Sequence, residues 1–163
     1  PMDLELLFSR NPFLSEGAAQ FSFIRPVLSQ TVGLKGGQEP LTLDLPAEFR
    51  AKNVMVEALG AGLRRTQGYY ANTLKVQVVE TYGQILVSHA ETLQPVPGAY
   101  VKVYARTRIG QIQFLKDGYT DLRGRFDYAS LNTNEVDDAD RLAVLVISDD
   151  FGAVVREAAP PKR

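Results

Sequence analysis

The residues that could support catalysis are few in this 163-residue chain, which has one histidine, His89, and no cysteine. A general-base pair would join His89 to its neighbour Ser88. Successive residues of a strand point to opposite faces, so these two side chains cannot meet if their segment is a strand. One imidazole and no thiolate also exclude most transition-metal sites. The sequence therefore predicts no catalytic residue, no metal site and no cofactor, and we expect the chain not to be an enzyme.

A candidate binding face lies where polar and apolar residues alternate. Val101, Val103 and Ala105 share one face of an expected strand, and the other face carries Tyr100, Lys102, Tyr104 and Arg106. Aromatic rings beside cations can bind a glycan or a peptide. The same rings could instead cover the sheet or meet a neighbouring domain, and the chain lacks tryptophan, which carbohydrate sites favour. These four residues are therefore the predicted binding site.

The net charge argues against nucleic acid as a partner, and the uneven local charge has two interpretations. The 18 basic and 19 acidic residues give a net charge of −1, which argues against nucleic acid. Locally the balance is +4 over residues 102–125 and −5 over residues 135–150. Either these charges compensate one another within one domain, or they dock the module head-to-tail on a like module, which allows a homo-oligomer. The acidic stretch 132–140 lacks the spacing of an EF-hand and is expected to be a solvated loop.

The elements that must position these side chains are predominantly strands. Turn residues separate short alternating segments, and helix is expected only over 46–52. Strands are predicted near 20–25, 27–34, 41–45, 53–59, 62–70, 74–81, 83–90, 99–107, 111–116, 124–130, 142–148 and 153–158. The apolar run 142–147 does not alternate, so its strand should be central and covered on both faces. Six residues are too few to cross a membrane, and we expect no membrane insertion. This spacing is typical of β-sandwiches.

Turn residues mark the expected connections. Pro97 cannot donate to a ladder and belongs to a loop, and Gly98 is expected to relieve a backbone crossing. Asp121 should cap a hairpin whose conformation needs Gly124. Phe126 should fill the core between the sheets.

Residues 82–159 resemble the carboxypeptidase regulatory-like, or transthyretin-like, β-sandwich family. Its hallmarks are a G-x-V strand at Gly83, a turn ending in Pro97-Gly98-Ala99, a V-x-V strand, and a T-D-x-x-G-x-F hairpin holding Asp121, Gly124 and Phe126. The resemblance implies a transthyretin-like sandwich. Two enzyme families that share or approach this fold need histidines, or a C-terminal motif, that this chain lacks. The resemblance also slightly favours an extracytoplasmic location.

The preceding residues are less distinctive. Residues 19–81 resemble an immunoglobulin-like sandwich of macroglobulin type, with alternating apolar residues but no diagnostic motif. We therefore expect an N-terminal extension over 1–18 that packs on the first domain, an immunoglobulin-like sandwich over 19–80, and a transthyretin-like sandwich over 81–163.

These observations together predict an all-β chain of two consecutive sandwiches. The expected function is that of a non-enzymatic structural or protein-interaction module, the C-terminal part of a larger bacterial protein. Its partners would be proteins or other domains of that parent. The alternative is a glycan- or peptide-binding module that uses an exposed tyrosine face.

Overall fold

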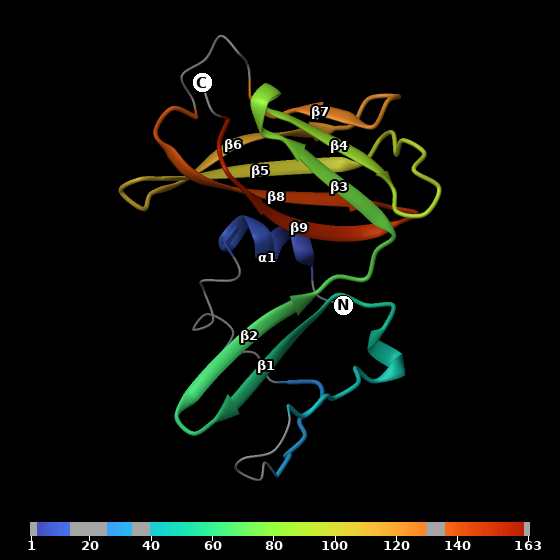
Figure 1. Ribbon diagram of the computed structural model, residues 1–163, viewed down its shortest axis with the longest axis vertical. Helices are drawn as coiled ribbons and strands as arrows, with labels where there is room; N and C mark the ends of the chain where they lie inside the picture. Colours follow the sequence, from blue (N-terminus) through green and yellow to red (C-terminus); the bar gives the residue numbers. More distant parts are fainter. Residues whose placement is uncertain (1–2, 14–25, 34–39, 130–135, 162–163) are drawn as a thin grey trace.

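The structure is a computed structural model that describes residues 3–13, 26–33, 40–129 and 136–161. Most of the regular structure is β, and the described strands form three sheets. Two of these sheets face each other in the C-terminal part, and a separate hairpin lies beyond a short helix (Figure 1).

Two antiparallel sheets build the C-terminal sandwich. The three-stranded sheet has the order β3-β4-β7 and comprises β3 (Leu74–Val79), β4 (Gln84–His89) and β7 (Arg125–Asp127). The four-stranded sheet has the order β6-β5-β8-β9 and comprises β6 (Ile112–Tyr119), β5 (Tyr100–Thr107), β8 (Ala139–Ser148) and β9 (Gly152–Ala158). β3 pairs with β4 along its whole length, although the predicted domain boundary falls after residue 80.

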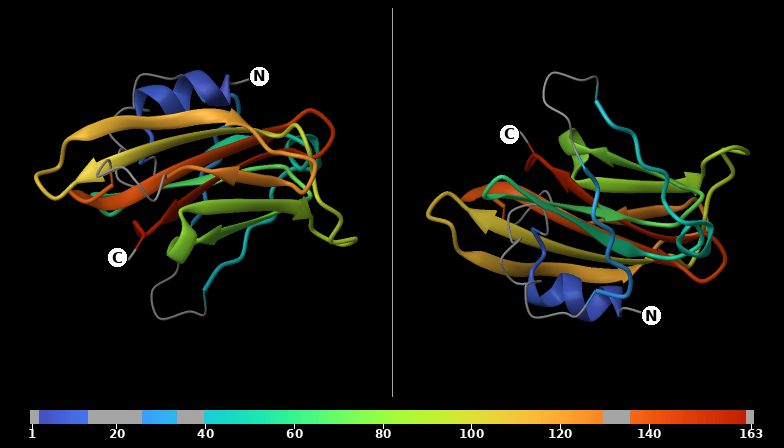
Figure 2. Two further views of the ribbon diagram at one scale, coloured as in Figure 1. Left: turned by 90° about the horizontal axis from the view of Figure 1, so that it is seen from above. Right: turned by 90° about the horizontal axis from the view of Figure 1, so that it is seen from below.

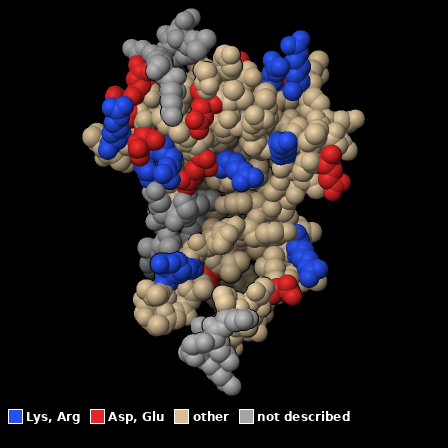
Figure 3. All heavy atoms as spheres, viewed as in Figure 1, with Lys and Arg blue, Asp and Glu red and all other residues tan. Residues whose placement is uncertain are grey.

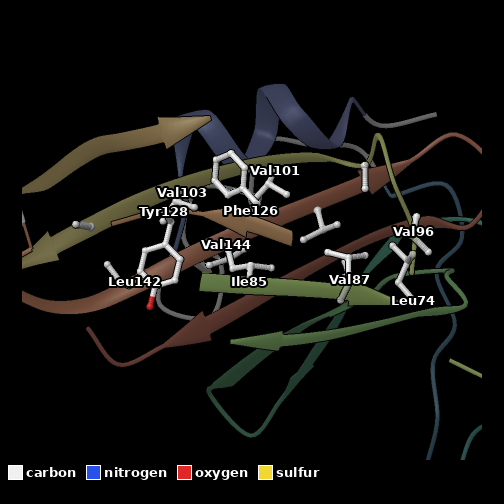
Figure 4. Close-up of a cluster of buried hydrophobic side chains, with 14 of the residues drawn as sticks. Leu74, Ile85, Val87, Val96, Val101, Val103, Phe126, Tyr128, Leu142 and Val144 are labelled. Carbon is white, nitrogen blue, oxygen red and sulfur yellow. The ribbon is translucent and has the colours of Figure 1, made fainter. Parts of the chain in front are cut away.

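The main core lies between these two sheets (Figure 4). β8 supplies Leu142, Val144 and Val146 to it, while the intervening Ala143 and Leu145 pack into a second cluster on the outer face. All five side chains are 0% exposed. The prediction that residues 142–147 form a central strand covered on both faces is therefore confirmed.

A helix covers the outer face of the four-stranded sheet. α1 (Leu4–Arg10) lies on the opposite side of this sheet from β3 and β4 (Figure 2). Its N-cap is Asp3, whose Oδ1 accepts a hydrogen bond from the Leu6 amide at 3.1 Å. Its buried apolar residues pack against β8 and β9 of the C-terminal sandwich, and Tyr70 packs against the same cluster. The packing of residues 1–18 on the first domain stays a prediction. The helix was not predicted.

Before β3, the described residues contain fewer strands than the sequence predicted. β1 (Val54–Gly60) and β2 (Leu63–Tyr69) form a hairpin with seven residue pairs, and a single 3-10 turn, η2 (Ala47–Phe49), stands in place of the expected helix. Residues 27–33 and 41–45 are not strands, which corrects two predictions. Their side chains are mostly exposed, so no second sheet face stabilises an extended pairing there. The predicted strand over 20–25 lies outside the described residues.

The turn residues act in different ways. Gly124 has φ +70°, and a Cβ there would lie 2.2 Å from the Val87 carbonyl oxygen. Gly83 has φ +60° and ends η3 (Glu80–Tyr82). Gly98 has φ +69° but no atom within 4 Å of an added Cβ, so the expected backbone crossing is absent and only the dihedral angle favours glycine. Pro97 lies in the turn before β5, and Phe126 belongs to the core.

Asp121 stabilises the turn before β7, and this gives a testable pH dependence. Its Oδ1 accepts hydrogen bonds from the amides of Arg125 and Arg123, both at 2.8 Å, and these bonds hold the pKa of the carboxyl below its ordinary value. A lowered folded-state pKa stabilises the fold above the unfolded pKa, and this stabilisation disappears as the pH falls through the folded pKa. We expect Asp121→Asn to be less stable than wild type near neutral pH, with the difference closing in acid. Urea midpoints across an acidic pH series measure it, and a constant difference would contradict the assignment.

Candidate interaction surface on the outer sheet face

The outer face of the four-stranded sheet is covered by residues 3–13. Leu4, Phe8 and Phe13 are only 5%, 0% and 2% exposed, and they form a cluster with Ala143, Leu145 and Ala153. Tyr70, Tyr104, Ile147 and Val155 pack around this cluster. We call this arrangement the outer cluster. Each buried ring removes a large apolar area from water, so the helix is held mainly by the hydrophobic effect.

All four residues of the predicted binding site lie in or beside the outer cluster. The Tyr104 ring meets the Phe8 ring edge-on with centroids 5.7 Å apart, and the Arg106 guanidinium lies 5.1 Å from the centre of the Phe13 ring. Lys102 Nζ donates to Glu5 Oε1 at 3.1 Å.

Tyr100 lies between two carboxylates at the edge of the predicted binding site. Its hydroxyl donates to Asp117 Oδ2 at 2.8 Å and lies 3.4 Å from Glu5 Oε1. The four side chains are half-buried, so the expected exposed tyrosine face is in fact a face already occupied by a segment of the same chain.

The Tyr100 hydroxyl should make the helix contact sensitive to alkali. Burial raises the pKa of Tyr100, and so do its hydrogen bond to Asp117 and the nearby Glu5 carboxylate. A raised folded-state pKa means that the stabilisation is present at neutral pH and lost as the pH rises through that pKa. We expect Tyr100→Phe to lose about 1 kcal/mol near neutral pH and to show a weaker alkaline decline. Denaturation midpoints across an alkaline series check this; an unchanged decline would contradict it.

An uncovered apolar strip continues from the outer cluster onto β6. Ile112, Phe114 and Tyr119 are 48%, 53% and 69% exposed. Phe114 contacts Tyr104 with ring centroids 5.6 Å apart, and Tyr119 contacts Tyr100 at 5.5 Å. We call these three residues the β6 strip. Phe114 thus adjoins Tyr104 of the outer cluster, and Tyr119 adjoins Tyr100 of the predicted binding site.

His89 and Ser88, the residues considered for catalysis, make contacts within the fold. The His89 Nδ1 accepts hydrogen bonds from the Thr92 and Glu91 amides at 3.2 and 3.3 Å, and its ring packs edge-on against Phe151. Ser88 lies beside it on β4, where alternate residues face opposite ways. Within the described residues there is no group of three or more His, Cys, Asp or Glu side chains that could hold a metal ion.

The two charged regions meet in the fold. Arg106 from the basic region pairs with Asp140 from the acidic region, with nitrogen and oxygen 3.1 Å apart. On the face shown in Figure 3, acidic and basic side chains lie next to one another over the C-terminal sandwich. This arrangement favours compensation within the domain over a head-to-tail dipole. Residues 132–135 of the acidic stretch 132–140 lie outside the described residues.

A hydrogen-bonded joint connects the hairpin to the sandwich. The Ala71 amide donates to Asn53 Oδ1 at 3.0 Å, and the Thr73 amide donates to the Phe151 carbonyl at 2.9 Å. Asn72 forms an isolated antiparallel bridge with Gly152. Tyr70 packs on the outer cluster, where burial raises the pKa of its hydroxyl. Residues 70–73 therefore tie the hairpin to the same sheet that α1 covers.

Comparison with known proteins places these parts in one family. The family model of the AbpF C-terminal domain matches residues 73–163, which is more than half of the chain. The chain belongs to this family. A second model, the AbpF seventh immunoglobulin-like domain, matches residues 1–56. Thus α1 lies within the segment matched by the seventh-domain model, and it packs on a sheet matched by the C-terminal model.

A curated relative agrees along nearly the whole chain. Actin-binding protein F of Dictyostelium discoideum is 36% identical over 160 residues, which is 98% of this chain but only 7% of that protein. No solved structure matches. The chain therefore spans a small part of its relative.

The family also settles part of the predicted fold. The mostly β structure and the two immunoglobulin-like models bear out the predicted fold class of two consecutive β-sandwich domains. Among the described residues, two facing sheets are seen in the C-terminal domain. The transthyretin-like assignment of residues 82–159 stays a prediction, since the matching models describe immunoglobulin-like domains. The expected bacterial parent has no support, because the relative is eukaryotic. Within the described residues, no helix has the length and apolar character needed to span a membrane.

Proposed function

We propose that the chain is a non-enzymatic structural and protein-interaction module of a larger, actin-associated protein. It holds the N-terminal immunoglobulin-like part and the C-terminal sandwich at a fixed orientation. The contact of α1 with the outer sheet face carries this proposal, because a segment from one matched domain is buried against the sheet of the other. In this proposal the C-terminal sandwich starts at residues 70–73, where the joint lies.

Several observations support a mechanical rather than a chemical role. His89 accepts hydrogen bonds from the turn that follows it, and the predicted site residues contact residues 3–13. The name of the relative points to actin as a partner of that whole protein. The transthyretin-like topology of residues 82–159 would suit the same role, because such modules mostly serve as accessories in larger proteins.

The experiment measures the orientation of the two parts directly. The chain has no cysteine, so spin labels can be placed at Lys52→Cys before β1, within the segment matched by the seventh-domain model, and at Leu122→Cys in the turn before β7, both exposed positions. We expect double electron–electron resonance (DEER) spectroscopy to give one narrow distribution of distances between the two labels. In the Leu4→Ala/Phe8→Ala background the distribution should broaden, while the matched Leu6→Ala control, whose side chain is 50% exposed, should stay narrow.

Equally broad distributions in all three proteins would overturn the fixed orientation. Co-sedimentation with actin filaments addresses the partner separately. Pelleting that rises with filament concentration would assign part of the actin contact to this module, and its absence would restrict the module to spacing other domains.

A further inference from the structure

We propose that the outer face of the four-stranded sheet is a peptide-docking site for a segment of a partner protein, and that residues 3–13 occupy this site in cis. The ligand is an amphipathic helical segment with an acidic residue in its first turn, an aromatic residue three positions later and a second aromatic residue five positions after that. This inference rests on the proposed role as a protein-interaction module, and it names the chemistry of the partner.

The contacts of the cis segment define what the site recognises. The small side chains of Ala143 and Ala153 lie in the outer cluster with Phe8, and Tyr104 packs edge-on against its ring. Lys102, whose side chain is 15% exposed, forms an ion pair with the acidic residue, which is Glu5 in the cis segment. The Arg106 guanidinium lies over the second aromatic ring, which is that of Phe13. Together these groups select an apolar, acidic and aromatic pattern in one direction along β5.

The cis segment is an imperfect occupant. α1 has only seven residues, and a helix of that length is marginal without its tertiary contacts. Asn11 is 7% exposed, and its Nδ2 has no hydrogen-bond partner among the described residues. A buried amide without a partner weakens binding. A segment with an apolar residue at that position would therefore bind more tightly than the cis segment does.

The β6 strip favours a partner protein over a second copy of this chain. Exchange of identical segments between two copies would recreate the contacts that each copy already makes, and would leave Ile112, Phe114 and Tyr119 exposed. A longer partner segment can cover both the outer cluster and the β6 strip. That additional apolar burial is what allows a ligand in trans to displace one tethered in cis, because the tether gives the cis segment a high effective concentration.

The first experiment uses a fluorescent synthetic peptide of residues 3–13 as the probe and the full chain as the receptor. The Leu4→Ala/Phe8→Ala chain has a weakened cis segment, so we expect it to bind the peptide saturably and at least about tenfold more tightly than wild type. An Asn11→Ala peptide should bind about tenfold more tightly than the unmodified peptide. A Glu5→Lys peptide should bind at least about fivefold more weakly, and the Lys102→Glu chain should reverse that preference.

The outcomes separate the site from nonspecific adhesion. Binding that is equal for wild type and the double variant, and indifferent to the Glu5→Lys change, would overturn the proposal. So would the absence of binding to a double variant whose amide spectrum retains the sandwich core. If the double variant does not fold, the Lys102→Glu chain alone tests the same site through charge reversal.

A second experiment tests the β6 strip. A displayed library that keeps Leu4, Glu5, Phe8 and Phe13 and varies the flanking residues should select apolar flanks, and the enrichment should disappear on an Ile112→Ser/Phe114→Ser chain. A wild-type dimer that disappears in the Leu4→Ala/Phe8→Ala chain would instead identify a second copy as the occupant and overturn the partner assignment. The spin-label distances are independent of these results, so a failed docking site would leave the fixed orientation standing.

Discussion

Replacing Gly152 by alanine is expected to lower the free energy of unfolding by about 3 to 4 kcal/mol. Gly152 begins β9 at φ +84°, which an L-residue rarely adopts. An added Cβ would lie 2.1 Å from the Ala71 carbonyl oxygen and 3.0 Å from the Asn72 Cα. Because both neighbours are backbone atoms of the joint between hairpin and sandwich, relief requires that residues 71–72 move.

Gly110 is a matched control for this substitution. It also has φ +84°, but no atom lies within 4 Å of an added Cβ. Gly110→Ala should therefore cost about 1 kcal/mol, which is the strain of the dihedral angle alone. Urea denaturation of the two variants, compared with wild type, separates dihedral strain from the collision with the joint. Equal losses at the two positions would show that residues 71–72 do not approach Gly152 in solution.

The C-terminal sandwich was largely predictable because its strands record burial in their sequence. Val101, Val103 and Ala105 alternate, and all three are buried in the main core. The run 142–147 does not alternate, because one set of its side chains enters the main core and the other enters the outer cluster. A period-two pattern marks a strand with one buried face, and an unbroken apolar run marks a strand that is buried on both faces.

The helix was missed although a local signal was present. Asp3 stands at an N-cap position, and Leu4, Leu7 and Phe8 follow at the spacing of one helical face. Seven residues give too short a period to stand out, and the surface that stabilises the helix is nearly 100 residues away in the sequence, at Tyr104 and Lys102. Such a partner is a property of the tertiary structure.

The same distance explains why the sequence placed the four residues on one face but did not predict what covers that face. Alternation places Tyr100, Lys102, Tyr104 and Arg106 together on a face, and they do line one surface. Alternation does not say what covers that surface. Strands were also predicted over 27–34 and 41–45 from local apolar residues, yet Leu28 and Leu43 remain 53% and 61% exposed. Local pattern identifies apolar residues, whereas the availability of a partner surface decides whether they form a sheet.

Phe8→Ala provides the most direct energetic measure of the contact between α1 and the sheet. Phe8 is 0% exposed, and its ring packs against Tyr104 within the outer cluster. Removing a fully buried ring should lower the free energy of unfolding by about 3 kcal/mol, the lower end for such changes, because a short helix can shift to fill part of the space. Leu6→Ala removes a side chain of the same helix that is 50% exposed, and should change stability by no more than about 0.5 kcal/mol.

Urea midpoints of both variants, with slopes compared to wild type, give these values. If Phe8→Ala were as stable as Leu6→Ala, the helix would not be packed on the sheet in solution, and both the fixed orientation and the occupied docking site would lose their basis. A large loss at Phe8 with none at Leu6 would establish that the outer face gains much of its stability from a peptide segment.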